Sequence, residues 1–236
     1  MRHLGFMVIF VFGCFSYWNS SAERIDPLWE KVIAQNNKNK SWIPKNNRET
    51  LLITRDDREV KQILIEKKFE QWANDHAVYR PIDAAALSGL EELPSMPIDM
   101  DVLFDFQGAG GYTSRTNLSH SDVPGINNKQ VVLFEVHHSR YRLKLWVDED
   151  SGKIYRQSID ILVPFTLDGS LESAYLAQAG ITKPMIERGS IETNFVDDDE
   201  GRPLIQQRRS HFILPRSAKK EEMTITNVFS NYVTLD

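Results

Sequence analysis

Residues 127–163 constrain the fold most, because they predict three consecutive antiparallel strands. In the middle strand Tyr141, Leu143, Leu145 and Val147 share one face and alternate with polar residues and Trp146, the period of two that a half-buried strand requires. Residues 148–152 (DEDSG) then form a tight turn, in which glycine readily takes a positive φ. The two flanking strands alternate in the same way, with Tyr155, Ile159 and Ile161 assigned to the apolar face of the third. This stretch therefore predicts an antiparallel sheet with one apolar and one polar face.

The remainder of the chain adds more strands and few helices. Residues 59–68 fit a helix or a strand, and the acidic turn before them favours the strand. The predicted strands cover residues 49–55, 59–68, 98–106, 112–116, 189–196, 204–214 and 223–233. The predicted helices cover 26–35, 83–92 and 170–179, the first ending at the polar tract 35–40. No change of composition divides these elements, so residues 23–236 are expected to form a single mainly β domain.

Composition and charge exclude one class of partner. The chain has 236 residues, with 28 Lys and Arg against 33 Asp and Glu, and a net charge of -5. A protein that binds nucleic acid through its phosphates needs a basic surface, which this balance does not favour. We therefore expect no nucleic-acid partner.

The N-terminus has the form of an export signal. A basic start, Met1-Arg2-His3, precedes a nearly continuous apolar run over residues 4–15, and Ser20-Ser21-Ala22 provides small residues for cleavage. That apolar run is shorter than the roughly 20 residues of a membrane-spanning helix. Residues 1–22 are thus predicted to be a signal peptide that directs the chain to a bacterial periplasm.

A second interpretation of the same segment involves Cys14. Residues 11–14 (VFGC) match a lipobox apart from the bulky Phe12, and in that case Cys14 would become the lipidated first residue of a protein anchored to the outer membrane. Cys14 is also the only cysteine, so no disulfide can form within the chain. The domain must be stabilised by its core alone.

The sequence gives little support for catalysis. It lacks the nucleophile elbow, the zinc-protease helix and a cysteine–histidine pairing. His137 and His138 are adjacent on a predicted strand and so point to opposite faces, which prevents them from sharing a metal. Residues 197–200 (DDDE) lack the spacing of a calcium loop, and Arg208-Arg209 is expected at the surface, with contact to a lipid headgroup as the alternative. We predict a protein without enzymatic activity, metal or cofactor.

The order of several short motifs carries a resemblance to a known family. The chain has Asp-Pro-Leu-Trp-Glu at 26–30 and Trp-Ile-Pro at 42–44. Leu-Trp-Val-Asp follows at 145–148, Asp-Ser-Gly-Lys at 150–153, and Val-Phe-Ser-Asn-Tyr at 228–232. In this order the motifs resemble those of bacterial outer-membrane lipoprotein-sorting-like proteins, which share the LolA/LolB lipoprotein-carrier fold.

This resemblance covers most of residues 26–236 and implies an unclosed antiparallel half-barrel curled around a few short helices. In that family the apolar concavity holds acyl chains. A sheet with one apolar face must either pack on helices or enclose another apolar group, and three short helices cover only part of such a face. The cavity candidates are apolar positions expected to face inward: Trp29, Val102, Phe104, Leu143, Leu145, Ile159, Ile161, Ile191 and Phe195.

Two functions are consistent with this pattern. In the first, the protein binds an acyl chain or a lipoprotein in the concave cavity, as in outer-membrane lipoprotein sorting. In the second, the same apolar residues pack against the protein's own helices, and the domain is an interaction scaffold for another envelope protein.

Overall fold

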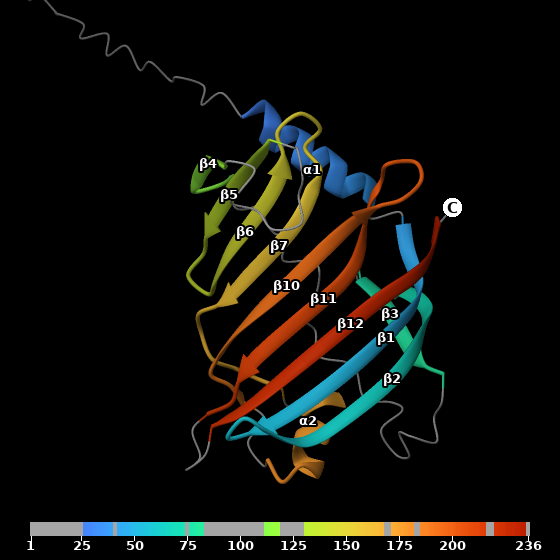
Figure 1. Ribbon diagram of the computed structural model, residues 1–236, viewed down its shortest axis with the longest axis vertical. Helices are drawn as coiled ribbons and strands as arrows, with labels where there is room; N and C mark the ends of the chain where they lie inside the picture. Colours follow the sequence, from blue (N-terminus) through green and yellow to red (C-terminus); the bar gives the residue numbers. More distant parts are fainter. Residues whose placement is uncertain are drawn as a thin grey trace, which may run out of the picture.

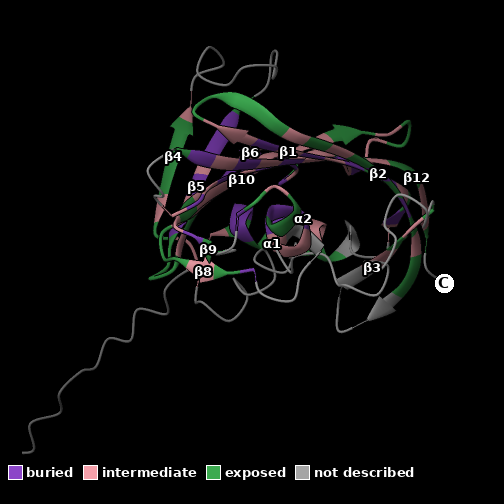
Figure 2. Cartoon of the chain, turned by 90° about the horizontal axis from the view of Figure 1, so that it is seen from below, coloured by how far each residue is buried: buried purple, intermediate pink, exposed green. Residues whose placement is uncertain are grey.

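The computed structural model describes residues 26–39, 42–73, 76–82, 111–118, 130–167, 171–181, 185–215 and 220–234. Within these ranges the chain forms one ten-stranded antiparallel sheet that is not closed and that curls around two short helices (Figures 1 and 2). The expected mainly β half-barrel is thereby confirmed. The predicted signal segment, which contains Cys14, and the predicted elements at 83–92 and 98–106 lie outside the described residues.

The strand order across the sheet is β3-β2-β1-β12-β11-β10-β7-β6-β5-β4, and β8 pairs separately with β9. The helices are α1 (Pro27–Asn39) and α2 (Leu171–Gln178). The strands of the large sheet are β1 (Trp42–Arg55), β2 (Arg58–Ala73), β3 (His76–Pro81), β4 (Ser114–Leu118), β5 (Val131–His137), β6 (Tyr141–Asp148), β7 (Ile154–Ile161), β10 (Arg188–Asp197), β11 (Pro203–Ile213) and β12 (Glu221–Thr234). The small pair consists of β8 (Phe165–Thr166) and β9 (Met185–Ile186), neither of which is among the strands expected from the sequence.

The three strands predicted from residues 127–163 are confirmed as β5, β6 and β7. Gly152 has a φ of 75° at the β6–β7 turn, as the turn sequence requires. The assignment of Tyr155 to the apolar face was wrong. The register shifts between Trp146 and Val147, so Ile154 lies opposite Val147. A bulge of this kind moves one residue out of the alternation, and Tyr155 instead donates a hydrogen bond to Asp148 at 2.7 Å.

Helix α1 starts where the sequence predicts but ends later. Asp26 caps it by accepting a hydrogen bond from the backbone N–H of Leu28 at 2.8 Å. Its buried face consists of Leu28, Trp29 and Val32. The helix continues through the polar tract to Asn39, because Gln, Asn and Lys residues cost a helix only a few tenths of a kcal/mol each. None of the helices in the described ranges has the length and hydropathy needed to cross a membrane.

The two helices lie at opposite ends of the concave inner face of the sheet, which we call the hollow (Figure 1). Helix α1 crosses the end formed by the β6–β7 turn, where Lys31 Nζ donates to the carbonyl of Asp150 at 2.8 Å. Helix α2 lies at the end where β2 begins: the ring of Tyr175 is below Lys61 Nζ, 5.9 Å from the ring centroid. Gly180, with a φ of 81°, ends α2 as predicted. Neither of the two described helices therefore crosses the middle of the inner face.

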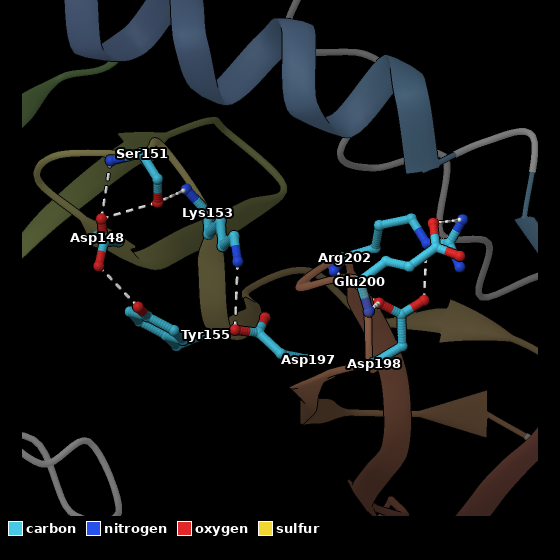
Figure 3. A network of polar contacts seen from close by, with 8 residues as sticks. All are labelled: Asp148, Ser151, Lys153, Tyr155, Asp197, Asp198, Glu200 and Arg202. Atoms are coloured by element: carbon cyan, nitrogen blue, oxygen red, sulfur yellow. Dashed lines mark hydrogen bonds and ion pairs between the residues drawn. The ribbon is translucent and has the colours of Figure 1, made fainter.

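Polar contacts fix the end of the sheet beneath α1 (Figure 3). Asp148 accepts hydrogen bonds from the backbone N–H and the hydroxyl of Ser151. Lys153 Nζ bridges to Asp197 Oδ2 at 3.2 Å, which joins the β6–β7 turn to the β10–β11 turn. The Arg202 guanidinium lies 3.7 Å from the ring centroid of Trp42. These contacts hold the start of β1 against the two turns.

Candidate binding site on the inner face of the sheet

One half of the inner face, formed by β5, β6, β7 and β10, is a packed apolar core. Trp29 of α1 meets it, with its ring centroid 5.1 Å from that of Phe134 and 5.6 Å from that of Tyr112. Among the predicted cavity residues, five are buried in this core: Trp29, Leu143, Leu145, Ile159 and Ile191. Ile161 and Phe195 are half-buried against it, and Val102 and Phe104 lie outside the described residues.

The inner face is not apolar throughout, although the sequence pattern predicts a continuous apolar face. Directly opposed residues on successive strands form a polar row across its middle. From β7 to β1 this row consists of Gln157, Thr193, Arg208, Asn227 and Glu49. On the side of the row toward α2, the neighbouring inward positions on β10, β12 and β1 are Ile191, Ile225 and Leu51.

At the β1–β2–β12 end of this row, four buried residues form what we call the polar cluster: Asn47, Glu49, Lys67 and Asn227. Lys67 Nζ lies 2.9 Å from Glu49 Oε1, and the two side chains are only 2% and 5% exposed. The Asn227 amide donates to Glu49 Oε2 at 2.9 Å and to Asn47 Oδ1 at 3.2 Å. A buried ion pair is tolerated when hydrogen bonds replace part of the water that it has lost, and Asn227 supplies one such bond to the Glu49 carboxylate.

An aromatic cluster, Phe69, Tyr79 and Phe229, lies directly beside the polar cluster. Phe229 is opposite Asn47 on the neighbouring strand, and Tyr79 is opposite Phe69. The ring centroids are 6.1 Å apart for Phe69 and Tyr79 and 6.5 Å apart for Tyr79 and Phe229. All three rings are half-buried, and none belongs to the core cluster of the described residues. An apolar wall outside the main core thus adjoins a buried charged pair.

Arg208 connects the two clusters, because it is opposite Asn227 on the neighbouring strand and lies over the ring of Phe229. The Arg208 guanidinium lies 6.0 Å from the ring centroid of Phe229, within the range of a cation–π contact. The Tyr79 hydroxyl donates to the carbonyl of Pro44 at 2.8 Å, and burial raises the pKa of Tyr79 above its ordinary value. The surface position expected for the Arg208-Arg209 pair is therefore wrong for Arg208, which faces inward.

The other sequence candidates do not gather into a reactive site. His138 stacks on Tyr141 with ring centroids 4.7 Å apart, while His137 is exposed on the neighbouring position. Asp198 accepts hydrogen bonds from the backbone N–H groups of Arg202 and Glu200, and the bond from Arg202 is the main reason that its pKa lies below the ordinary value (Figure 3). In the described part of the chain, no group of three or more His, Cys, Asp or Glu side chains could hold a metal ion.

The polar cluster was not predicted, although the positions of its residues along β1 and β2 indicate it. Asn47 and Glu49 occupy the same parity as Leu51 and Ile53 on β1, and Lys67 has the same parity as Ile65 on β2. Charged residues at inward positions of two successive strands indicate a buried pair. The pairing of β1 with β12 could not be predicted from the sequence, because 180 residues separate Asn47 from Asn227.

Comparison with known proteins gives one structural likeness. No protein-family model and no curated protein matches the sequence. The structure is similar to the crystal structure of a LolA superfamily protein from Nitrosomonas europaea, at 12% sequence identity and a TM-score of 0.39, over 89% of this chain and 92% of that chain. At this identity no residue of that protein can be equated with a residue of this site.

Proposed function

We propose that this chain is a non-enzymatic protein of the bacterial envelope that binds an acyl chain, or the acylated end of a lipoprotein, on the inner face of its sheet. The observation that supports the proposal best is the aromatic cluster of Phe69, Tyr79 and Phe229, which is half-buried, separate from the main core and adjacent to buried charge. The three aromatic rings would bind the acyl chain, and the polar cluster would bind the polar group at the end of that acyl chain.

Physical magnitudes are consistent with such a ligand. Each methylene removed from water contributes about 0.8 kcal/mol, so an acyl chain that covers three rings gains several kcal/mol. An ester or amide at the end of the chain needs hydrogen-bond partners once water is excluded, since an unsatisfied buried polar group costs about 1–3 kcal/mol. Lys67 and Asn47 carry donors of the required kind beside the wall, whereas both N–H groups of the Asn227 amide already donate within the cluster. The predicted cavity residues Leu143, Leu145, Ile159 and Ile191 would then form the floor that keeps the sheet curved.

The location of the protein belongs to the same proposal. Residues 1–22 would be removed on export, or Cys14 would be lipidated, and residues 23–236 would act as one domain in the periplasm or at the outer membrane. A lipoprotein or free lipid would be the partner.

The second candidate function is an envelope interaction scaffold without a lipid ligand. It is favoured by the packing beneath α1, where Leu143 and Leu145 are 0% exposed and leave no apolar surface to a ligand. In that case the half-buried aromatic rings would only complete the core.

Native mass spectrometry of the exported protein separates the two functions. The lipid-binding function predicts a co-purifying acyl lipid, or stoichiometric uptake of an added long-chain fatty acid. Phe229→Ser should weaken uptake about tenfold or more, because it removes one wall of the site. Val228→Ser is the matched control, since Val228 is adjacent on β12, points to the opposite face and is 41% exposed. A protein that neither carries nor takes up lipid supports the scaffold.

A further inference from the structure

Three consecutive apolar residues are exposed at the end of β7. Leu162 is 50% exposed, Val163 is 43% exposed, and Pro164 after them is also exposed. Soluble proteins rarely expose such a run unless it has a function. Met185, which is 40% exposed, extends the apolar surface because β9 pairs with β8 directly after this run.

Backbone contacts place basic residues on both sides of this run. The N–H of Leu162 donates to the carbonyl of Arg140 at 2.9 Å, so the β5–β6 turn lies directly beside it. On the other side, Arg188 precedes Gly189, which is paired with Ile161. Both arginines are exposed. We refer to Arg140, Leu162, Val163, Met185 and Arg188 together as the apolar corner.

Acidic residues are few in the apolar corner and concentrated at the opposite end of the same strands. Near the corner, Glu187 pairs with Arg188, and Asp160 is opposite the exposed Arg142. At the far end the β6–β7 turn reads DED at 148–150, and the β10–β11 turn reads DDDE at 197–200. Lys153 and Arg202 neutralise part of the charge at that end. An anionic surface would repel the acidic surplus that remains and attract the corner, which orients the domain.

We propose that the apolar corner docks this domain onto an anionic lipid bilayer, with Leu162, Val163 and Met185 entering the headgroup region and Arg140 and Arg188 lying against phosphates. This inference concerns the outside of the domain and does not depend on a ligand in the hollow. An apolar group this small is typical of shallow insertion, in which a few side chains enter the headgroup boundary and neighbouring basic residues add electrostatic attraction to anionic headgroups.

A protein partner is less consistent with the same surface. A stable protein interface needs about 800 Å² from each partner, with an apolar centre and a polar rim. The apolar corner offers three exposed apolar residues, with the exposed Pro164 next to them, and charged side chains flank them immediately. A bilayer requires no such area, because it deforms around a small insertion.

Co-sedimentation of the exported chain with vesicles tests the proposal. Vesicles that contain phosphatidylglycerol should bind the protein, phosphatidylcholine vesicles should bind it weakly, and added salt should reduce binding. Leu162→Glu with Val163→Glu should lower binding to anionic vesicles about tenfold or more. The matched control is Val60→Glu with Leu64→Glu on β2, where exposed apolar residues of similar exposure, 41% and 57%, lie far from the corner.

Circular dichroism and melting curves verify that each variant folds, and Leu162→Ser with Val163→Ser provides a milder second variant. The proposal is overturned if the wild-type protein does not bind anionic vesicles at low salt. It is equally overturned if the corner variants and the β2 control lose binding to the same extent. Uptake of a fatty acid into the hollow should be unchanged in the corner variants, so a failure of this inference is distinguishable from a failure of the proposed function.

Discussion

The two halves of the inner face have the same strand alternation but different chemistry. Under α1 the inward positions on β5 and β6 are Phe134, Leu143 and Leu145, all fully buried. On β1, β2 and β12 the inward positions include Glu49, Lys67 and Asn227 beside the aromatic cluster. The first half is an apolar core throughout, while the second combines core residues such as Leu51 and Ile225 with buried polar groups and half-buried rings. A period of two therefore predicts which face points inward, but it does not predict what that face does.

The largest effect should come from the packed half. Phe134→Ala should lower the free energy of unfolding by about 3–5 kcal/mol, because it leaves a cavity between the rings of Trp29 and Tyr112. The same change at the half-buried Phe229 should cost about half as much or less. Urea unfolding measures both, and equal losses at the two sites would remove the distinction between a core half and a site half.

The polar cluster should respond differently to single and double substitutions. Lys67→Met should cost about 3 kcal/mol, because it leaves the buried Glu49 carboxylate without its cation. Lys67→Met combined with Glu49→Leu should restore much of that stability and should still impair lipid uptake. Urea unfolding together with fatty-acid uptake checks this, and a double variant with normal uptake would show that the cluster is structural only.

Docking of α1 can be tested at Gly152. A Cβ there would lie 2.6 Å from the Cβ of Lys31 on α1, and the positive φ of 75° adds strain. Gly152→Ala should therefore cost about 2–3 kcal/mol. Gly180→Ala is the control, since its φ is 81° but a Cβ meets nothing within 4 Å, and about 1 kcal/mol is expected. Equal melting temperatures for the two variants would contradict the close approach of α1 to the turn.

The smallest effect concerns acid stability in the half that contains β12. The hydrogen bond from Lys220 Nζ, at 2.9 Å, holds the pKa of Glu222 below its ordinary value. A lowered pKa in the folded state gives a contribution that is present above the unfolded value of about 4.3 and is lost as the pH falls through the folded value. Urea midpoints between neutral and acidic pH should decline less in Glu222→Gln than in the wild type. An unchanged decline would show that this pair does not contribute.

Much of the fold follows from local patterns, whereas the candidate site does not. Alternation and the turn at Gly152 predict β5, β6 and β7, and the residue pattern predicts the start of α1 at Asp26-Pro27. The end of α1 was wrong because exposed polar residues neither favour nor break a helix strongly. The site depends on the pairing of β1 with β12, whose residues Asn47 and Phe229 are far apart in sequence. No local pattern specifies which distant strands become neighbours.

Photolabelling with a long-chain fatty acid that carries a diazirine tests the central claim most directly. Peptide mass spectrometry of the labelled protein should find the label on β2, β3 and β12 around Phe69, Tyr79 and Phe229, and an excess of unlabelled fatty acid should compete it away. Label that does not saturate, or that falls on β5 and β6 beneath α1, would contradict the assignment of lipid binding to the aromatic half of the inner face.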